Sequence, residues 1–381
     1  MAPAVMTPSR RAIVAAIGLS VAGVAAFSVL PVMVGILTDS HGLGASLAGY
    51  VASADLAGFA LTALAAAFWV VRCRWRRAAI VGLSALVIGN LLSLGTPGFA
   101  QLLIARLLAG IGAGTVYSVA MSTLARCRDT DRAFGLMIAA QVIFQVIALF
   151  VLPRLVAVWG PSALFLTLGG VSVLASVGIT QLPDFIEGSS EPPTTMLATR
   201  SAWLALAGVA LFTLNLGALW TYIERMGVSA GLSSPQVGSM LAAALAISVL
   251  GALGASRLGD RFGRRLPLVV AMAGQLVALV LMTENASAVA FAIGATLYSL
   301  AWAFAVPYFY GFVASHDPGG RLIVLAPAVQ AIGVSLGPLL AASMLRGDPY
   351  LLVNCLAAVA LLGAVACVLS ATPRERLQLT P

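Results

Sequence analysis

The apolar segments are the feature that most restricts what this chain can fold into. Its 381 residues are 61% hydrophobic and only 9% charged, whereas a soluble protein carries about 25% charged residues. A helix needs roughly 20 apolar residues to cross a bilayer, and twelve such helices with short loops take up about 32 residues each, which accounts for the whole length. The sequence therefore predicts an all-α integral membrane protein with twelve transmembrane helices.

Twelve apolar segments can be placed along the chain, and a polar stretch divides them into two sets of six. Residues 183–200 include Asp184, Glu187, Glu191 and the Pro192-Pro193 pair, a composition that breaks helices and is typical of a linker. We therefore expect a bundle at 1–182, a cytoplasmic linker at 183–200 and a second bundle at 201–381. The expected spans are 12–37, 44–70, 78–95, 99–124, 133–157, 162–182, 201–226, 235–256, 266–283, 287–315, 322–345 and 350–371.

The arginines predict the orientation, because loops on the cytoplasmic side carry an excess of basic residues. The chain has 21 basic residues and no lysine. Arg106 lies inside a span, three arginines fall on the side opposite the N-terminus (Arg154, Arg225 and Arg346), and the other 17 fall on the N-terminal side. Both termini are therefore expected in the cytoplasm. The net charge of +8 thus reflects membrane orientation, and we expect no nucleic-acid partner.

The loop Arg257-Leu258-Gly259-Asp260-Arg261-Phe262-Gly263-Arg264-Arg265 lies between two apolar segments. Its glycines permit a tight turn, and its arginines favour the cytoplasmic side. The loop resembles the signature Gly-x-Leu-x-Asp-Arg-x-Gly-Arg-Arg of the major facilitator superfamily, which joins the second and third helices of each six-helix half. The matching residues are Leu258, Asp260, Arg261, Gly263, Arg264 and Arg265, while Ser256 stands at the first glycine.

A partial copy of this loop supports an internal repeat. Arg76-Arg77 lies 188 residues before Arg264-Arg265, but residues 71–77 contain neither the aspartate nor the glycines. If the acidic residue latches one conformation, the first half lacks that latch and Asp260 retains it. The resemblance implies two pseudo-symmetric six-helix bundles, alternating access and a substrate site between the bundles near the midplane.

Asp55 is a candidate proton-coupling residue. It lies about 11 residues into the second span, roughly 16 Å along a helix that rises 1.5 Å per residue, and so close to the midplane. An unpaired charge there costs at least about 2.5–3.5 kcal/mol, so Asp55 could bind and release a proton near neutral pH. The alternative is a structural hydrogen bond to a neighbouring helix.

Arg106 is the second candidate. Its side chain can reach a depth similar to that of Asp55, and it precedes Gly110, Gly112 and Gly114. Gly110 and Gly114 form a Gly-x-x-x-Gly face for close helix packing. This segment resembles the superfamily's fourth-helix motif, whose arginine is associated with proton coupling or substrate anions. We expect Asp55 and Arg106 to pair until a proton neutralises Asp55; a purely structural arginine is the alternative.

Further polar and aromatic residues recur within the spans. Trp220, Tyr222 and Glu224 lie near the outer end of the seventh span. Trp220 and Tyr222 are candidates to line the substrate cavity or form a gate, and Glu224 is a third proton-coupling candidate. The alternative is an interface anchor and a helix end. Gln141, Gln145, Asn215, Tyr298, Trp302 and Gln330 could line a cavity or join helices through hydrogen bonds worth about 0.6 kcal/mol each.

A Gly-x-x-x-Gly-Pro element occupies the eleventh span as Gly333, Gly337 and Pro338. Proline removes a backbone hydrogen bond and glycine allows close approach, so a kinked packing site is expected. The element resembles one that drug/proton antiporters carry in their fifth helix, which here lacks it.

We therefore interpret the chain as a monomeric secondary transporter of the bacterial inner membrane. It is expected to move a small organic solute, such as an organic or aromatic acid, with a proton gradient and without cofactor or metal. A multidrug or metabolite efflux antiporter is the alternative. A receptor-like or enzymatic role is disfavoured, because the loops are short and no Walker loop, zinc spacing or nucleophile constellation is present.

Overall fold

The structure, a computed structural model, describes residues 8–40, 42–70, 72–94, 98–127, 130–182, 199–283, 286–316, 321–345 and 350–371. Those residues form helices joined by short turns, and no strand occurs among them. Of the predicted linker, residues 183–198 lie outside the described ranges.

The first half contains α1 (Arg10–Ser28), α2 (Leu30–Asp39), α3 (Ala45–Trp69), α4 (Trp75–Leu92), α5 (Phe99–Leu124), α6 (Thr130–Trp159) and α7 (Ser162–Ser176), followed by the 3₁₀ helix η1 (Ile179–Gln181). The second half contains α8 (Arg200–Ser229), α9 (Ser234–Leu258), α10 (Arg265–Leu281), α11 (Ala288–His316), α12 (Arg321–Met344) and α13 (Leu351–Ser370).

The twelve predicted spans correspond to these helices. Within the described ranges, 11 helices are long and apolar enough to cross a membrane. The ninth span is α10, whose 17 residues extend about 25 Å at 1.5 Å per residue. The first span consists of α1 and α2 in succession, so the predicted segment 12–37 is interrupted.

Pro31 explains the interruption between α1 and α2. It lies at the start of α2 and has no N–H to donate to the carbonyl of Phe27, four residues earlier. The helix breaks at Val29, whose φ and ψ are −107° and 14°. The Phe27 carbonyl accepts an N–H of the cap at the end of α1, and it also accepts a hydrogen bond from Trp220 Nε1 at 3.0 Å. A local backbone rule thus creates a contact between the two halves of the chain.

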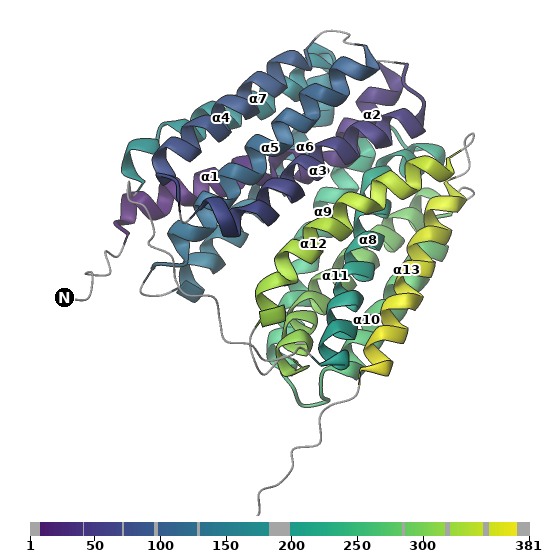
Figure 1. Cartoon of the computed structure of the whole chain (residues 1–381). Helices are drawn as coiled ribbons and strands as arrows, with labels where there is room; N and C mark the ends of the chain where they lie inside the picture. Colours follow the sequence, from purple (N-terminus) through teal and green to yellow (C-terminus); the bar gives the residue numbers. More distant parts are fainter. Residues whose placement is uncertain are drawn as a thin grey trace, which may run out of the picture.

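The helices form two bundles (Figure 1). In the first bundle α5 packs against α1, α3 and α4, and in the second α8 packs against α12 and α13 while α11 packs against α9 and α10. The bundles meet where α3 contacts α12, α6 contacts α9 and α2 contacts α8. In Figure 1 they lie together near α2 and diverge toward the N-terminal end of α1.

The predicted glycine motifs lie at the tightest helix contacts. A Cβ atom at Gly110 or Gly114 would lie 1.9 or 2.6 Å from a backbone oxygen of α3, and one at Gly112 would lie 2.5 Å from a backbone oxygen of α4. Gly333 and Gly337 pack in the same way against α8. The helix α12 continues through Pro338.

Candidate functional site

Asp55 and Arg106 face one another inside the first bundle. Arg106 Nη1 lies 3.2 Å from Asp55 Oδ2, and the two side chains are 1% and 5% exposed. The remaining guanidinium donors reach α4 and the turn after it: Nη2 donates to Asn90 Oδ1 at 3.0 Å and Nε donates to Ser93 Oγ at 3.2 Å. The guanidinium also lies 5.2 Å from the centroid of the Phe165 ring. The charge is therefore enclosed by partners from three other helices or their ends.

Glycine packing brings this pair together. Because Gly110 has no side chain, α5 approaches the Asp55 backbone closely, and the Arg106 side chain, one turn earlier on α5, extends to the Asp55 carboxylate. A buried ion pair is stable only when further hydrogen bonds satisfy its remaining polar atoms. Asn90 and Ser93 supply those bonds here.

The second bundle has a neutral polar contact instead. Asn215 Nδ2 donates to the Tyr298 hydroxyl at 2.9 Å, and both residues are buried, at 0% and 2% exposure. They connect α8 and α11 within one bundle. This is the arrangement expected if the two residues join helices rather than line a cavity.

Aromatic residues of α8 hold the bundles together at the side opposite the start of α1, here called the far side. Trp220 bonds to the Phe27 carbonyl, and the Tyr222 hydroxyl donates to the Ala45 carbonyl at 3.2 Å. Ser46 Oγ donates to the Ala342 carbonyl at 2.6 Å, which adds α12 to the contact. These bonds join elements more than 170 residues apart in sequence.

An ion cluster completes the far-side contact. Arg225 binds both carboxylate oxygens of Asp39, at 2.6 and 2.8 Å, across the bundle boundary. It also binds Glu224 at 2.6 and 3.0 Å within its own bundle, and Ser234 Oγ donates to Glu224 at 2.6 Å. A Cβ at Gly35 would lie 2.5 Å from Glu224 Oε2, so α2 approaches α8 closely at this point.

The other cavity candidates are partly buried. Gln141 and Gln145 lie on α6, and the Gln141 amide interacts with the Tyr117 hydroxyl of α5. Gln330 of α12 accepts a hydrogen bond from the Tyr310 hydroxyl of α11. The Nε2 atom of Gln141 is buried without a hydrogen-bond partner in the described part of the chain. The same holds for Nε1 of Trp302 on α11.

The signature loop forms a tight turn between α9 and α10. Gly259 and Gly263 have φ angles of +56° and +66°, a region that residues with a Cβ rarely adopt. The Tyr308 hydroxyl donates to the Gly259 carbonyl at 2.8 Å, and the Gly263 N–H donates to the Asp260 carbonyl at 2.8 Å. The Asp260 carboxylate forms no ion pair with the residues that the structure describes.

An arginine of each arginine pair binds carbonyls near the end of the last helical segment of its bundle. Arg265 donates to the Ala371 carbonyl at the end of α13. In the first half, Arg76 donates to the carbonyls of Thr180 and Leu182, at 2.9 and 3.2 Å, at the end of η1. The partial copy of the loop therefore makes a similar contact, through the first arginine of its pair where the signature loop uses the second.

Metal ligands do not gather anywhere in the described ranges, where no group of three His, Cys, Asp or Glu side chains is found.

Comparison with known proteins identifies the family. A family profile described as Major Facilitator Superfamily matches residues 15–206, half of the chain. The chain belongs to the Major Facilitator Superfamily. Members of this family are transporters rather than enzymes, and the apolar helices of this chain are those of an integral membrane protein.

Sequence relatives of this Major Facilitator Superfamily member are distant. It is 29% identical over 220 residues to the uncharacterized MFS-type transporter YcaD of Escherichia coli O45:K1 (strain S88 / ExPEC), a match that covers 55% of this chain and 57% of the relative. YcaD of Escherichia coli O17:K52:H18 matches at 28% identity over the same lengths. The match thus spans little more than half of either protein.

Solved transporters confirm the fold over nearly the whole chain. An auto-inhibited peptide transporter of the POT family superposes with a TM-score of 0.77 at 14% identity, covering 97% of this chain and 99% of that one. A bacterial homologue of the human lysosomal transporter Spinster, inward-facing and unoccupied, superposes with a TM-score of 0.64 at 15% identity and covers 94% and 93%.

Five residues of these sites were not predicted from the sequence: Asp39, Asn90, Ser93, Tyr117 and Tyr310. Asp39 ends a helix, where an acidic residue is ordinary. The others are single polar residues in apolar segments, like several that only join helices. Asn90 carried the clearest signal, because an amide inside a span is expected to have a partner.

Proposed function

We propose that this transporter moves a small organic solute, such as an organic or aromatic acid, across the bacterial inner membrane by alternating access coupled to protons. No cofactor is required, and the protein acts as a monomer in the bilayer. The observation that carries the proposal is the enclosed Asp55–Arg106 pair. Asp55 is a titratable group buried inside a membrane protein, and Arg106 supplies its counter-charge.

Proton binding to Asp55 would rearrange this pair. Removing one partner of a buried ion pair costs about 3–5 kcal/mol, because the other charge is left uncompensated. Here a neutral Asp55 leaves Arg106 with Asn90, Ser93 and the Phe165 ring. These groups lower the cost of the protonated state, so both protonation states remain accessible during a transport cycle.

Alternating access requires the far-side contacts to open. Opening separates Arg225 from Asp39 and Trp220 from the Phe27 carbonyl. Arg225 retains Glu224, which belongs to its own bundle. If the termini are cytoplasmic, as the arginine distribution supports, the far side is the outer side and this conformation faces inward.

Substrate binding is assigned to the partly buried polar and aromatic face of Gln141, Tyr117, Tyr310 and Gln330. Gln141 and Tyr117 belong to the first bundle and the other two to the second, so a solute could contact both. The guanidinium of Arg106 is enclosed, so an acidic substrate could reach it only after its pair with Asp55 opens. Proton binding would then precede binding of the acid, an order that favours symport.

Purified protein in liposomes with an internal pH-sensitive dye tests the proposal. The panel comprises organic acids, aromatic compounds and lipophilic cationic drugs. We expect proton movement with one organic acid, and we expect Asp55→Asn to abolish both that movement and the pH dependence of uptake. Ser53→Ala is the matched control, because Ser53 is buried on the same helix and bonds only to its own backbone turn.

Two outcomes would overturn the proposal. Unchanged transport and unchanged pH dependence in Asp55→Asn would remove proton coupling from this pair. A response only to varied lipophilic drugs would replace the acid transporter with an efflux antiporter.

A further inference from the structure

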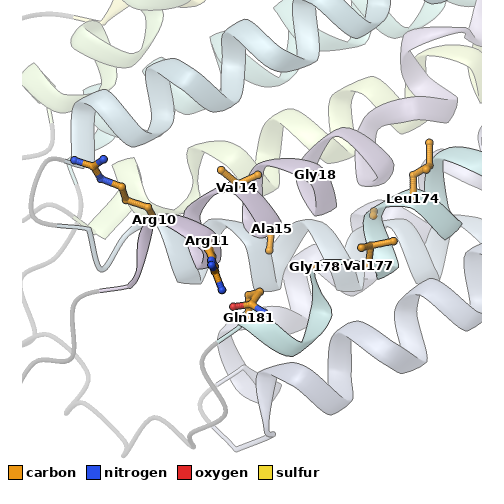
Figure 2. Close-up of a pocket in the computed structure, with 10 residues that line it drawn as sticks. Arg10, Arg11, Val14, Ala15, Gly18, Leu174, Val177, Gly178 and Gln181 are labelled. Atoms are coloured by element: carbon orange, nitrogen blue, oxygen red, sulfur yellow. The ribbon is translucent and has the colours of Figure 1, made fainter.

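A groove on the outer surface of the first bundle lies apart from the sites described above. It runs between α1 and the segment formed by α7 and η1, and its volume is about 550 Å³. Arg11 and Gln181 lie at one end, while Val14, Gly18 and Leu174 line the rest (Figure 2). The groove is thus polar at the end where α1 begins and apolar along its length.

The equivalent position in the second bundle is filled. Ser9 caps α1 and Thr199 caps α8 through the same bond to the third following N–H, so Gly18 corresponds to Gly208. A Cβ at Gly208 would lie 3.5 Å from Cys367 of α13, whereas a Cβ at Gly18 would have no atom within 4 Å. At Gly208 the second bundle therefore lacks the space that Gly18 leaves in the first.

The polar end of the groove is cationic. Arg10 and Arg11 are exposed at the start of α1, and Arg76 binds the carbonyls at the end of η1. The adjoining sequence, residues 8–20, 72–80 and 171–182, contains no aspartate or glutamate. An anionic group at this position would find guanidinium donors, and none of the residues that line the groove is acidic.

The rest of the groove offers apolar contacts to lipid. The side chains of Val14, Leu174 and Val177 are 70%, 73% and 79% exposed. Arginines at the start of a membrane helix lie at the level of the lipid headgroups. A ligand that contacts both parts must carry an anionic head and a long apolar chain.

We propose that this groove binds one anionic phospholipid from the leaflet on the N-terminal side. Its phosphate contacts Arg10, Arg11 and Gln181, and an acyl chain lies along Val14, Gly18 and Leu174. Basic pockets between transmembrane helices are suited to anionic headgroups. The bound lipid connects α1 to η1 and so stabilises the N-terminal-side end of the first bundle.

Native mass spectrometry of the full-length protein in detergent tests the site, with phosphatidylglycerol and phosphatidylcholine as probes. We expect the protein to retain one phosphatidylglycerol, and we expect retention to fall at least fivefold in the double variant Arg10→Gln/Arg11→Gln. Gly18→Leu fills the groove without touching the arginines and should have the same effect. Arg200→Gln, at the corresponding start of α8, is the control and should retain the lipid.

Three results would overturn the proposal. Equal retention of phosphatidylcholine would show that the headgroup charge is not recognised, and displacement of the lipid by inorganic phosphate would assign the arginines to a soluble anion. Undiminished retention in Gly18→Leu, with the variant eluting as folded protein, would place the lipid elsewhere.

Discussion

In the first bundle, Arg106 binds Asp55, Asn90 and Ser93, whereas the residues 188 positions later are Gly294, Ala243, Ala278 and Leu281. The structure supports this correspondence, because a Cβ at Gly294 would lie 3.0 Å from the Ala278 carbonyl and 3.1 Å from Leu281 Cβ. The same helix pair that holds an arginine network in one bundle is packed with small apolar residues in the other.

This difference bears on whether the Arg106 network serves the folding of the bundle or the function of the protein. Both bundles fold with buried glycine contacts, so the fold does not require the charged network. A charged side chain inside a membrane protein costs free energy, so it is retained where it has a function. This contrast favours the first bundle as the place of the proposed proton coupling, whereas the corresponding helices of the second bundle meet through apolar residues and the neutral contact Asn215–Tyr298, and its pair Glu224–Arg225 lies at the far-side boundary.

The largest effect is expected when the ion pair is broken on one side. Arg106→Gln leaves the Asp55 carboxylate buried without its counter-charge, and we expect a loss of about 3–5 kcal/mol in the free energy of unfolding. Adding Asp55→Asn should recover part of that loss. Denaturant unfolding of the purified single and double variants measures both, and simple additivity of the two losses would show that the residues do not act as a pair.

Breaking the close packing beneath the pair should have the next largest effect. Gly110→Ala would place a Cβ 1.9 Å from the Asp55 carbonyl, so α3 and α5 must separate, at a cost of about 1–3 kcal/mol for an overpacked site. Gly170→Ala is the control, because a Cβ there has no atom within 4 Å. Thermal unfolding of both variants checks this, and equal melting temperatures would contradict it.

Asp39→Asn should have a smaller effect, on the contact between the two bundles. The Asp39 side chain is 58% exposed, so its pair with Arg225 contributes at most about 1 kcal/mol. The far side should then open up to about fivefold more often, since 1.4 kcal/mol corresponds to a factor of ten. Cross-linking of cysteines introduced at Ser46 and Ala342 reports closure; Asp39→Glu keeps the charge and should cross-link like the parent.

The smallest effect is expected at the Asn215–Tyr298 contact of the second bundle. Tyr298→Phe removes the hydroxyl that accepts from Asn215, a hydrogen bond worth about 0.6 kcal/mol in a membrane bundle. The free energy of unfolding should fall by that amount, while the pH profile of transport stays unchanged. An altered pH profile would extend the proton pathway into the second bundle and would remove the contrast between the halves.

Some contacts of this protein could be predicted from the sequence and others could not. Asp55 and Arg106 could be paired in advance, because two opposite charges at similar depth in the second and fourth spans have few other partners. Asp39 could not, because its partner Arg225 lies 186 residues away and both residues look like ordinary helix ends. Tyr117 and Tyr310 have no signal beyond their residue type, and their neighbours Gln141 and Gln330 were recognised only as polar residues within spans.

The sequence by itself determined the membrane environment, the twelve spans and the signature loop, because hydropathy, glycine and charge act locally along the chain. Only the tertiary structure decided which side chains meet: the Phe27 carbonyl lies at the α1–α2 break before Pro31, and folding brings Trp220 to it. It also decided that Gly18 faces a groove while Gly208 faces α13. Such contacts depend on how distant helices pack, which no local pattern encodes.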